Sequence, residues 1–289
     1  MTTPIQQVPG LYRSRIGDAL VTTVNDGFLD CPAEIWNGAS QEQLGETAAD
    51  NFRPWPPRIT VNTFVIEIGE RTVLVDTGGG NLVESMGLLA GNLRAGGFAP
   101  DRIDTVLITH IHPDHTGGLL DADGERCFPN AEVVIAGDEI DFWSSRDVKE
   151  GRFAAATPYL GTATAVLQAY AGQIRRGTGK EIAPGLSAVP LPGHTPGHSG
   201  YSLKSAGESL LIWGDTVHAP EVQVPLPQVT SEFDVDQAQA AESRRRLFAH
   251  VAAERLLVAG MHLGFPAFAH VVAAGAGYRL IPQPWKVEP

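Results

Sequence analysis

The stretch THIHPDHTGG (residues 109–118) gathers three histidines and an aspartate within six positions: His110, His112, Asp114 and His115. The apolar, β-branched stretch RIDTVLIT (102–109) just before it predicts a buried strand. Side chains alternate faces along a strand, so His110 and His112 are expected to emerge on one side where the strand ends. Pro113 then stops strand pairing and turns the chain, so Asp114 and His115 leave in a different direction. Such a turn can aim ligands at two neighbouring points.

Composition and charge narrow the class of protein. The chain has 289 residues, of which 43% are hydrophobic, enough for a large core. The net charge is −12 and no basic run is present, so we expect no nucleic-acid partner. No apolar stretch approaches the roughly 20 residues of a membrane span, so no membrane association is expected either. The opening MTTPIQQVPG lacks the features of a signal peptide, and Cys31 and Cys127 cannot form a disulfide framework. We therefore expect a cytoplasmic protein.

Strand-like stretches that end in polar tips recur along the chain. We predict a strand, turn and strand over 19–30, a hairpin over 60–80, a helix over 81–95, a strand over 131–138, a long helix over 234–254 and a last strand over 255–264. Residues 31–59 lack clear periodicity and carry Trp36 and Trp55, so we predict a long loop that forms a flap over the site. Because no low-complexity linker interrupts the chain, residues 1–289 are predicted to form a single domain.

Three more potential metal ligands follow apolar strands. His194 lies in LPGHTPGH, Asp215 in LLIWGD and His262 in VAGMHLG, each flanked by glycine or proline. With the opening cluster they make five histidines and two aspartates, side chains that suit zinc or a related divalent ion. One zinc ion needs only about four ligands. The set therefore predicts two divalent ions that share a carboxylate, with a water or hydroxide between them.

Other polar residues receive supporting or structural roles. His250, on the predicted long helix, and His270, near the C-terminus, are expected to be structural. His198 is expected to orient the loop that holds His194. Asp76 is either a turn former or a hydrogen-bond acceptor for a ligand histidine, and we favour the second role. The glycines after Asp76 do not have the spacing of a dinucleotide-binding fingerprint.

These motifs resemble the motifs of a known protein family. THIHPDHTGG resembles the His-x-His-x-Asp-His motif of the metallo-β-lactamase-fold hydrolases, and VLVDTGGG, GHTPGHS, WGD and GMHLGFP resemble the family's other motifs in the same order, from about residue 60 to 282. The stretches VQVPLPQVTSEFDVD and HLGFPAFAHVVAAGAGYRLIP are similar to the group of methyl parathion hydrolases, lactonases and aryl esterases. The resemblance implies an α/β fold, namely a four-layer αββα sandwich, usually as a homodimer, with a dinuclear zinc centre.

The resemblance also implies roles for individual residues. His110, His112 and His194 would hold one ion, Asp114, His115 and His262 the other, with Asp215 bridging the two. Asp114 or Asp215 would move the proton during hydrolysis. The acyl-homoserine lactonases carry a substrate-binding tyrosine at the position of His218, and we expect His218 to donate a hydrogen bond there instead.

The expected substrate is a small, neutral ester or lactone. An acidic chain does not attract anionic substrates by its net charge, and aromatic and apolar side chains suit a pocket above the metals. The expected pocket residues are Trp36, Phe64, Leu82, Trp143 and Phe233. We predict a lactonase or aryl esterase for aryl lactones such as dihydrocoumarin, with organophosphate hydrolysis as a side activity. A phosphotriesterase remains open as the alternative, because the metal ligands do not discriminate it from a lactonase. A non-catalytic metal-binding protein is a remote alternative, and the presence of all seven ligands argues against it.

Overall fold

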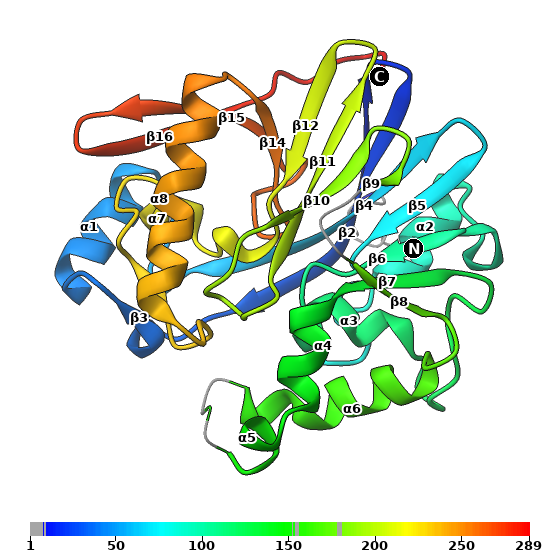
Figure 1. The fold of residues 1–289 in the computed structure, drawn as a ribbon. Coiled ribbons are helices and arrows are strands. Elements are labelled where there is room, and N and C mark those ends of the chain that lie inside the picture. Colours follow the sequence, from blue (N-terminus) through cyan, green and yellow to red (C-terminus); the bar gives the residue numbers. More distant parts are fainter. Residues whose placement is uncertain (1–7, 9, 152, 154–155, 178–180) are drawn as a thin grey trace, which may run out of the picture.

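Two large sheets stand face to face in the computed structural model, which describes residue 8 and residues 10–151, 153, 156–177 and 181–289 (Figure 1). The first sheet has the order β1-β2-β4-β5-β6-β7-β8, with bounds Leu11–Ile16, Ala19–Asp30, Arg58–Ile68, Arg71–Val75, Thr105–Leu107, Glu132–Ala136 and Ile174–Gly177. The second has the order β16-β15-β14-β12-β11-β10-β9, with bounds Gly277–Pro282, Phe268–Ala274, Leu257–Ala259, Glu208–Ile212, Ser199–Ser205, Leu186–Pro190 and Glu181–Ala183. A small third sheet pairs β13 (Thr230–Ser231) with β3 (Trp36–Asn37).

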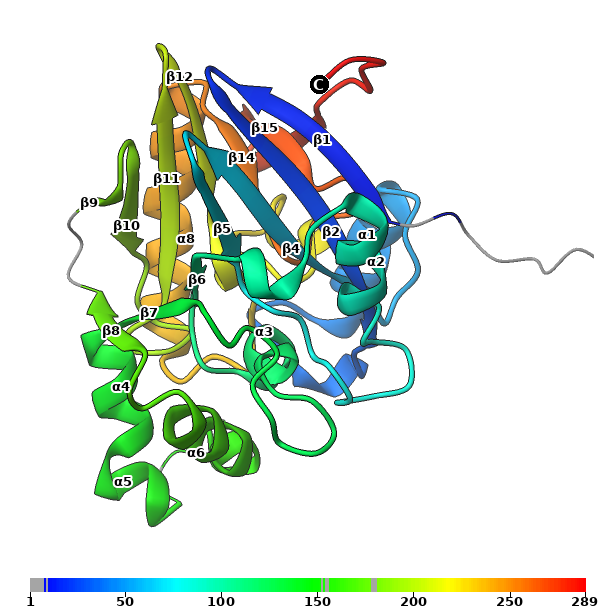
Figure 2. The same cartoon turned by 90° about the vertical axis from the view of Figure 1, so that its right-hand side faces the viewer.

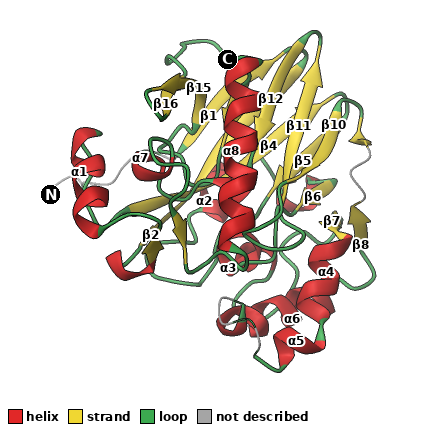
Figure 3. Cartoon of the chain, turned by 60° about the vertical axis from the view of Figure 1, so that its left-hand side comes forward, coloured by secondary structure: helices red, strands yellow, loops and turns green. Residues whose placement is uncertain are grey.

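Helices cover the outer face of each large sheet. The helices are α1 (Gln41–Asp50), α2 (Leu89–Gly96), α3 (Pro113–Thr116), α4 (Gly137–Ser144), α5 (Arg146–Lys149), α6 (Leu160–Ala169), α7 (Pro220–Gln223) and α8 (Gln237–Ala253). Helix α8 lies across the second sheet (Figure 3), and α2, α4 and α6 lie on the side of the first sheet (Figure 2). The arrangement confirms the predicted αββα sandwich. Within the described residues, no helix is both long and apolar enough to span a membrane.

Successive side chains of β4 point to opposite faces of the first sheet, and both faces are buried. Phe64 and Ile66 point into the core between the sheets, where they meet residues such as Leu203 of β11. Val65, between them in sequence, points to the opposite face and packs beneath the helices with Leu93 of α2. Alternate side chains of a strand point to opposite faces, so one continuous apolar strand serves both layers.

Some predicted elements differ from the structure. Residues 19–30 form one strand rather than two, because the Asn25–Gly27 step is a bulge and not a turn. A Cβ at Gly27 would lie 2.0 Å from the Ser85 carbonyl oxygen, so only glycine permits this close approach. The predicted helix over 81–95 begins only at Leu89. The strand β14 is not the last strand, since β15 and β16 follow it.

The predicted loop over 31–59 contains regular structure. The Ser40 hydroxyl accepts a hydrogen bond from Gln43 N (3.1 Å) and caps α1. Leu44 and Ala48 lie one turn apart on the buried face of that helix. Strand β3, which precedes α1 in the chain, pairs with β13 and connects the segment to it. Periodicity over only ten residues was too weak to reveal α1 in the sequence.

Candidate metal centre

Strand ends bring the potential ligands together. His110 and His112 follow β6, Asp215 follows β12 and His262 follows β14. Strands β12 and β14 pair in parallel, so their carboxyl ends lie at the same edge of the second sheet. Pro113 begins the short helix α3, which carries Asp114 and His115 in its single turn. The turn after β6 therefore sends its ligands in two directions, as the sequence predicts.

The first ligand group, called here the three-histidine cluster, consists of His110, His112 and His194. Nε2 of His194 lies 3.0 Å from Nε2 of His110 and 2.9 Å from Nδ1 of His112. Nδ1 of His194 donates to Asp234 Oδ1 (2.8 Å), which leaves a lone pair on Nε2. All three side chains are almost completely buried. Three nitrogen atoms this close together are better suited to binding one shared cation than to hydrogen-bonding with each other.

The second group, called here the mixed cluster, consists of Asp114, His115, Asp215 and His262. Nε2 of His115 lies 3.3 Å from Asp114 Oδ2 and 3.2 Å from Asp215 Oδ2, and Nε2 of His262 lies 3.1 Å from Asp215 Oδ2. The opposite nitrogens are already engaged, because Nδ1 of His115 donates to Asp76 (2.7 Å) and Nδ1 of His262 to the Thr60 carbonyl (2.8 Å). Their Nε2 atoms therefore face the carboxylates.

Asp215 lies between the two clusters. Its Oδ2 is also 3.7 Å from His110 Nε2 and 3.5 Å from His194 Nε2. Its Oδ1 is buried and, among the described residues, accepts no hydrogen bond. A buried carboxylate needs partners for its lone pairs. The donor set, with this free oxygen and the inward lone pairs of the histidines, fits divalent cations.

The electrostatics of the site also favour cations. Burial lowers the pKa of His110 and His112 well below the usual value, and the neighbouring histidines lower it further. Burial alone would lower the pKa of His115 too, but Asp215 and Asp114 outweigh it and raise that pKa well above the usual value. Burial would raise the pKa of Asp215, but His115 and His262 hold it well below its usual range. Neutral histidine and ionised carboxylate are the protonation states that bind metal. His110, His112 and Asp215 favour these states already, whereas the carboxylates around His115 favour a positive charge that a cation would supply in place of the proton.

The two predicted supporting residues bind the backbone and side chains of this centre. Asp76 accepts hydrogen bonds from His115 Nδ1 and from Thr109 N and Oγ1 (2.8 Å each for Thr109). His198 donates from Nδ1 to the Leu191 carbonyl (2.7 Å) and accepts at Nε2 from Asp215 N (2.8 Å). Burial lowers the pKa of His198 to about 3, which keeps this acceptor nitrogen unprotonated. His198 thus connects the loop of His194 to the backbone of Asp215. We predicted only the contact with the loop of His194.

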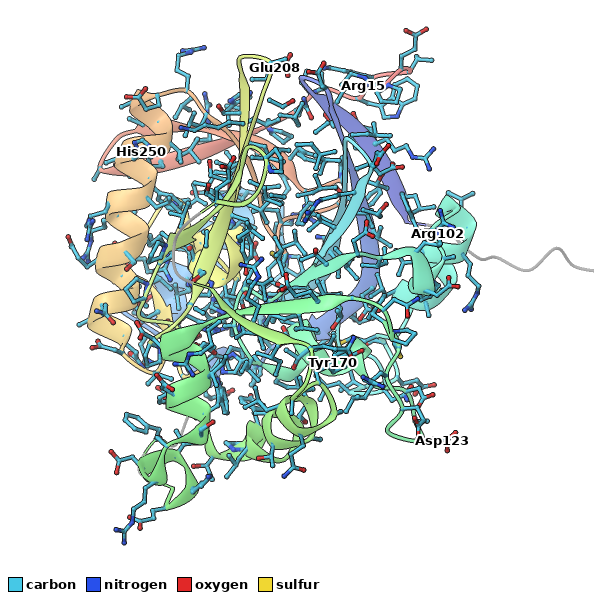
Figure 4. The ribbon with its side chains drawn as sticks, turned by 45° about the vertical axis from the view of Figure 1, so that its right-hand side comes forward. Arg15, Arg102, Asp123, Tyr170, Glu208 and His250 are labelled. Carbon is cyan, nitrogen blue, oxygen red and sulfur yellow. The ribbon has the colours of Figure 1, made fainter. Side chains whose placement is uncertain are left out.

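Sequence reasoning missed three buried groups around the ligands. Asp234 binds His194, the Thr60 carbonyl binds His262, and Glu139 binds the backbone next to the three-histidine cluster. Asp234 lies in SEFDVD, which resembled the family but offered no ligand spacing. Glu139 is in the first turn of a helix, where an acidic residue is ordinary. The histidines expected to be structural lie elsewhere: His250 is on the outer helix α8 (Figure 4), and His270 donates to the Leu256 carbonyl.

Four of the residues predicted to contact the substrate lie near the potential ligands: His218, Trp36, Phe233 and Trp143. His218 lies at the centre, with Nε2 3.2 Å from Asp215 Oδ2 and its ring stacked on His262 at 5.5 Å. Trp36 and Phe233 lie 6.5 and 6.1 Å from the His218 ring, and Trp143 lies 5.8 Å from the His112 ring.

The expectation for Phe64 was wrong, because it packs against Phe268 in the core between the sheets. Leu82 is 40% exposed, in the segment before α2. Tyr159, which we did not predict, lies 5.0 Å from the His112 ring. Sequence pattern alone did not distinguish aromatic residues of the core from those near the ligands.

A cavity of about 890 Å³ opens beside His262. Its wall includes Phe28, Leu88 and Phe265, and Leu88 is 52% exposed, which is unusual for leucine. The charge of Arg58 in this wall is balanced, because the guanidinium pairs with Asp30 (2.7 Å) and stacks over Phe28. The rest of the wall is mixed, because Arg53, Glu221 and polar side chains such as Asn25 and Asn92 also line the cavity. None of the five predicted pocket residues is among the described residues that line it.

Comparisons with known proteins agree with this geometry. The sequence profile of the Metallo-beta-lactamase superfamily matches residues 56–259. The crystal structure of hydrolase AbOPH, of the beta lactamase superfamily, is 32% identical and superposes with a TM-score of 0.91 over 97% of this chain and 100% of that one. AidC, described as a dizinc quorum-quenching lactonase, has the same fold, with 24% identity and a TM-score of 0.91 over 96% of this chain and 99% of that one.

A curated relative extends the range of activities. An atrochrysone carboxyl ACP thioesterase from Passalora fulva is 29% identical over 207 residues, or 67% of this chain and 53% of the relative. The chain thus aligns with about half the length of that relative. A specific likeness to methyl parathion hydrolase stays a prediction. Since the family profile covers most of the chain, the protein belongs to the metallo-beta-lactamase superfamily, and it has the fold of that family.

Proposed function

We propose that the protein is a dinuclear-zinc hydrolase of neutral carboxylic esters, most active on lactones and aryl esters. The observation that carries the proposal is the position of Asp215, whose Oδ2 faces histidines of both clusters at 3.1–3.7 Å. A carboxylate between two sets of nitrogen ligands is the arrangement that two-ion hydrolases use. His110, His112 and His194 would hold one ion, and Asp114, His115 and His262 the other.

The chain's own residues would orient the substrate and move the protons. When bound, the two ions would supply Lewis acidity to the ester carbonyl and to an attacking water. Asp114 is the most exposed of the proposed ligands, with 13% of its side chain accessible, so it is the carboxylate best placed to take a proton from water. The neutral His218 imidazole would donate its N–H to the oxygen on which negative charge develops.

Two observations favour a planar carbonyl substrate over a phosphotriester. The AidC protein, with the same fold, is described as a lactonase, and the Passalora fulva relative as a thioesterase, so both act on carboxylic acid derivatives. His218 also fills space beside Asp215, with Trp36 6.5 Å from its ring, which suits a planar group better than a tetrahedral centre with three substituents. In the cavity beside His262, Phe28, Leu88 and Phe265 offer apolar contacts that suit the apolar part of an ester.

A hydrolysis panel on metal-loaded protein tests the proposal. The panel comprises dihydrocoumarin, acyl-homoserine lactones, an aryl ester and methyl parathion. We expect the highest kcat/KM on the lactones or the aryl ester. A higher value on methyl parathion would instead assign a phosphotriesterase. If fully loaded protein turns over none of the substrates, the protein is not the proposed hydrolase and a metal-binding role without catalysis takes its place.

The proposal also includes a flap and a dimer, and of these two only the dimer rests on the family resemblance. We propose that residues 31–59, with α1 and β3, cover the site as a flap, since Trp36 reaches the His218 ring. We also propose a homodimer. Analytical ultracentrifugation of the metal-loaded protein tests the dimer, and a single species with the mass of one chain would contradict it.

A further inference from the structure

Glu139, in the first turn of α4, is a completely buried carboxylate with four hydrogen-bond donors around it. Its Oε1 accepts from Ile111 N (2.8 Å) and from the Trp143 indole Nε1 (2.7 Å). Its Oε2 accepts from the Thr195 hydroxyl (2.6 Å) and from Gly197 N (3.1 Å). Burial raises the pKa of Glu139, but the four donors favour its charged form. The carboxylate contacts none of the proposed ligand side chains through these bonds.

The four donors place Glu139 between two ligand-bearing loops. Ile111 lies between His110 and His112, and Thr195 directly follows His194. One carboxylate therefore connects the backbones of both loops that carry the three-histidine cluster. The packing is close, because a Cβ on Gly197 would lie 2.1 Å from Glu139 N. The same helix also presents Trp143 edge-on to the His112 ring, at 5.8 Å.

The mixed cluster has different supports. Its histidines are held by Asp76 and by the Thr60 carbonyl, and the backbone of Asp215 is held by His198. None of these three contacts involves Glu139 or α4. Glu139 therefore binds both loops that carry the three-histidine cluster and none of the side chains that support the mixed cluster. The supports still meet, because His198 shares the loop of His194 and Asp76 also binds Thr109, next to His110.

We propose that Glu139 is a positioning residue that selectively tunes metal affinity at the three-histidine cluster. Its hydrogen bonds hold the two loops at the spacing at which the three ligand nitrogens converge. Its buried negative charge also favours a cation nearby, since charges interact strongly where water is excluded. Outer groups that orient metal ligands typically change affinity about 10- to 100-fold when they are replaced. The inference rests on the two-ion site of the proposed function.

The test is the stepwise affinity for Zn²⁺, measured by competition with a chromophoric chelator on metal-free protein. Glu139→Gln keeps the side chain's shape but removes its charge and turns an amide N–H₂ toward donors that need an acceptor. We expect one of the two binding steps to weaken about 10- to 100-fold, while the other stays within about twofold of the natural protein. Asp76→Asn is the matched control. Asp76 binds a ligand ring of the mixed cluster directly and reaches the three-histidine cluster only through Thr109, so this variant should weaken the other step more than the first.

A purely structural role for Glu139 predicts different results. It would weaken both steps equally, or change neither while it lowered the melting temperature of the metal-free protein, and either result overturns the inference. If Glu139→Gln does not fold, Thr195→Val and Trp143→Phe each remove a single donor and should weaken the same step by a smaller factor. Unchanged affinity in both of these variants would also overturn it.

The proposed function and this inference can fail separately. If the natural protein takes up no divalent ion, both fail. If it binds two ions and hydrolyses lactones, but Glu139→Gln binds both ions as tightly as the natural protein does, only the inference fails.

Discussion

Replacing His218 by leucine removes one hydrogen-bond donor at the centre of the proposed site. The His218 side chain is about 1% exposed, and burial lowers the pKa of the ring, so the imidazole is neutral and carries a single N–H. Nε2 lies 3.2 Å from Asp215 Oδ2, and Nδ1 has no hydrogen-bond partner among the described residues. We expect the N–H to turn from Asp215 to a substrate oxygen when cations bind this carboxylate.

The size of the effect follows from this geometry. One well-placed donor to a developing oxyanion lowers the barrier by roughly 2.7–4 kcal/mol, so the kcat for dihydrocoumarin should fall about 100- to 1000-fold. The melting temperature should hold or rise, because leucine replaces buried nitrogens that lack partners with an apolar side chain. Methyl parathion hydrolysis should hold or rise, because leucine fills about the same space as histidine and the proposed role of the lost N–H concerns the lactone carbonyl.

The assay compares kcat for both substrates in protein of verified metal content. Metal content matters because His218 also lies within ligand distance of His194 and Asp234. Phe233→Leu is the control, because it changes the pocket beside His218 without removing a donor. Equal losses on both substrates, or no loss on either, would refute the role of His218.

Three further predictions test other parts of the argument. Elemental analysis should find about two divalent ions per chain, and Asp215→Ala should lose one ion and most activity. If the natural protein holds a single ion and Asp215→Ala is fully active, Asp215 does not bridge two ions. Trp55→Ala should change kcat/KM for bulky lactones more than stability, and it is a cleaner probe than Trp36, which is only 3% exposed; unchanged selectivity would remove the flap from the pocket. Burial raises the pKa of Asp26 from 3.8 to about 6, so the native state holds this proton more tightly than the unfolded chain does. Relative to Asp26→Asn, the free energy of unfolding in urea with chelator present should therefore fall by roughly 3 kcal/mol as the pH rises from about 4 to 6.5 and level off above; parallel pH profiles would show that this carboxyl does not titrate as proposed.

The sequence alone determined those features that depend on local spacing. His110 and His112 are two residues apart at the end of a strand, and Pro113 can only begin the turn that follows, so their directions are set by backbone geometry. The apolar runs that precede His194, Asp215 and His262 likewise predicted strand-end ligands. Their number and chemistry predicted metal binding, because histidines and carboxylates are costly to bury without partners.

Only the tertiary structure decided how these ligands and their supports combine. The position of Asp215 between the clusters depends on the parallel pairing of β12 with β14, which are separated along the chain by α8. Phe64 and Trp36 are both aromatic and both buried, yet one lies between the sheets and the other near His218. Glu139 and Asp234 gain their roles from contacts 28 and 40 residues away in sequence, to Ile111 N and to His194. Local spacing fixes the face on which a side chain leaves its strand or helix, but its partners across the fold are fixed by the order in which distant strands pair.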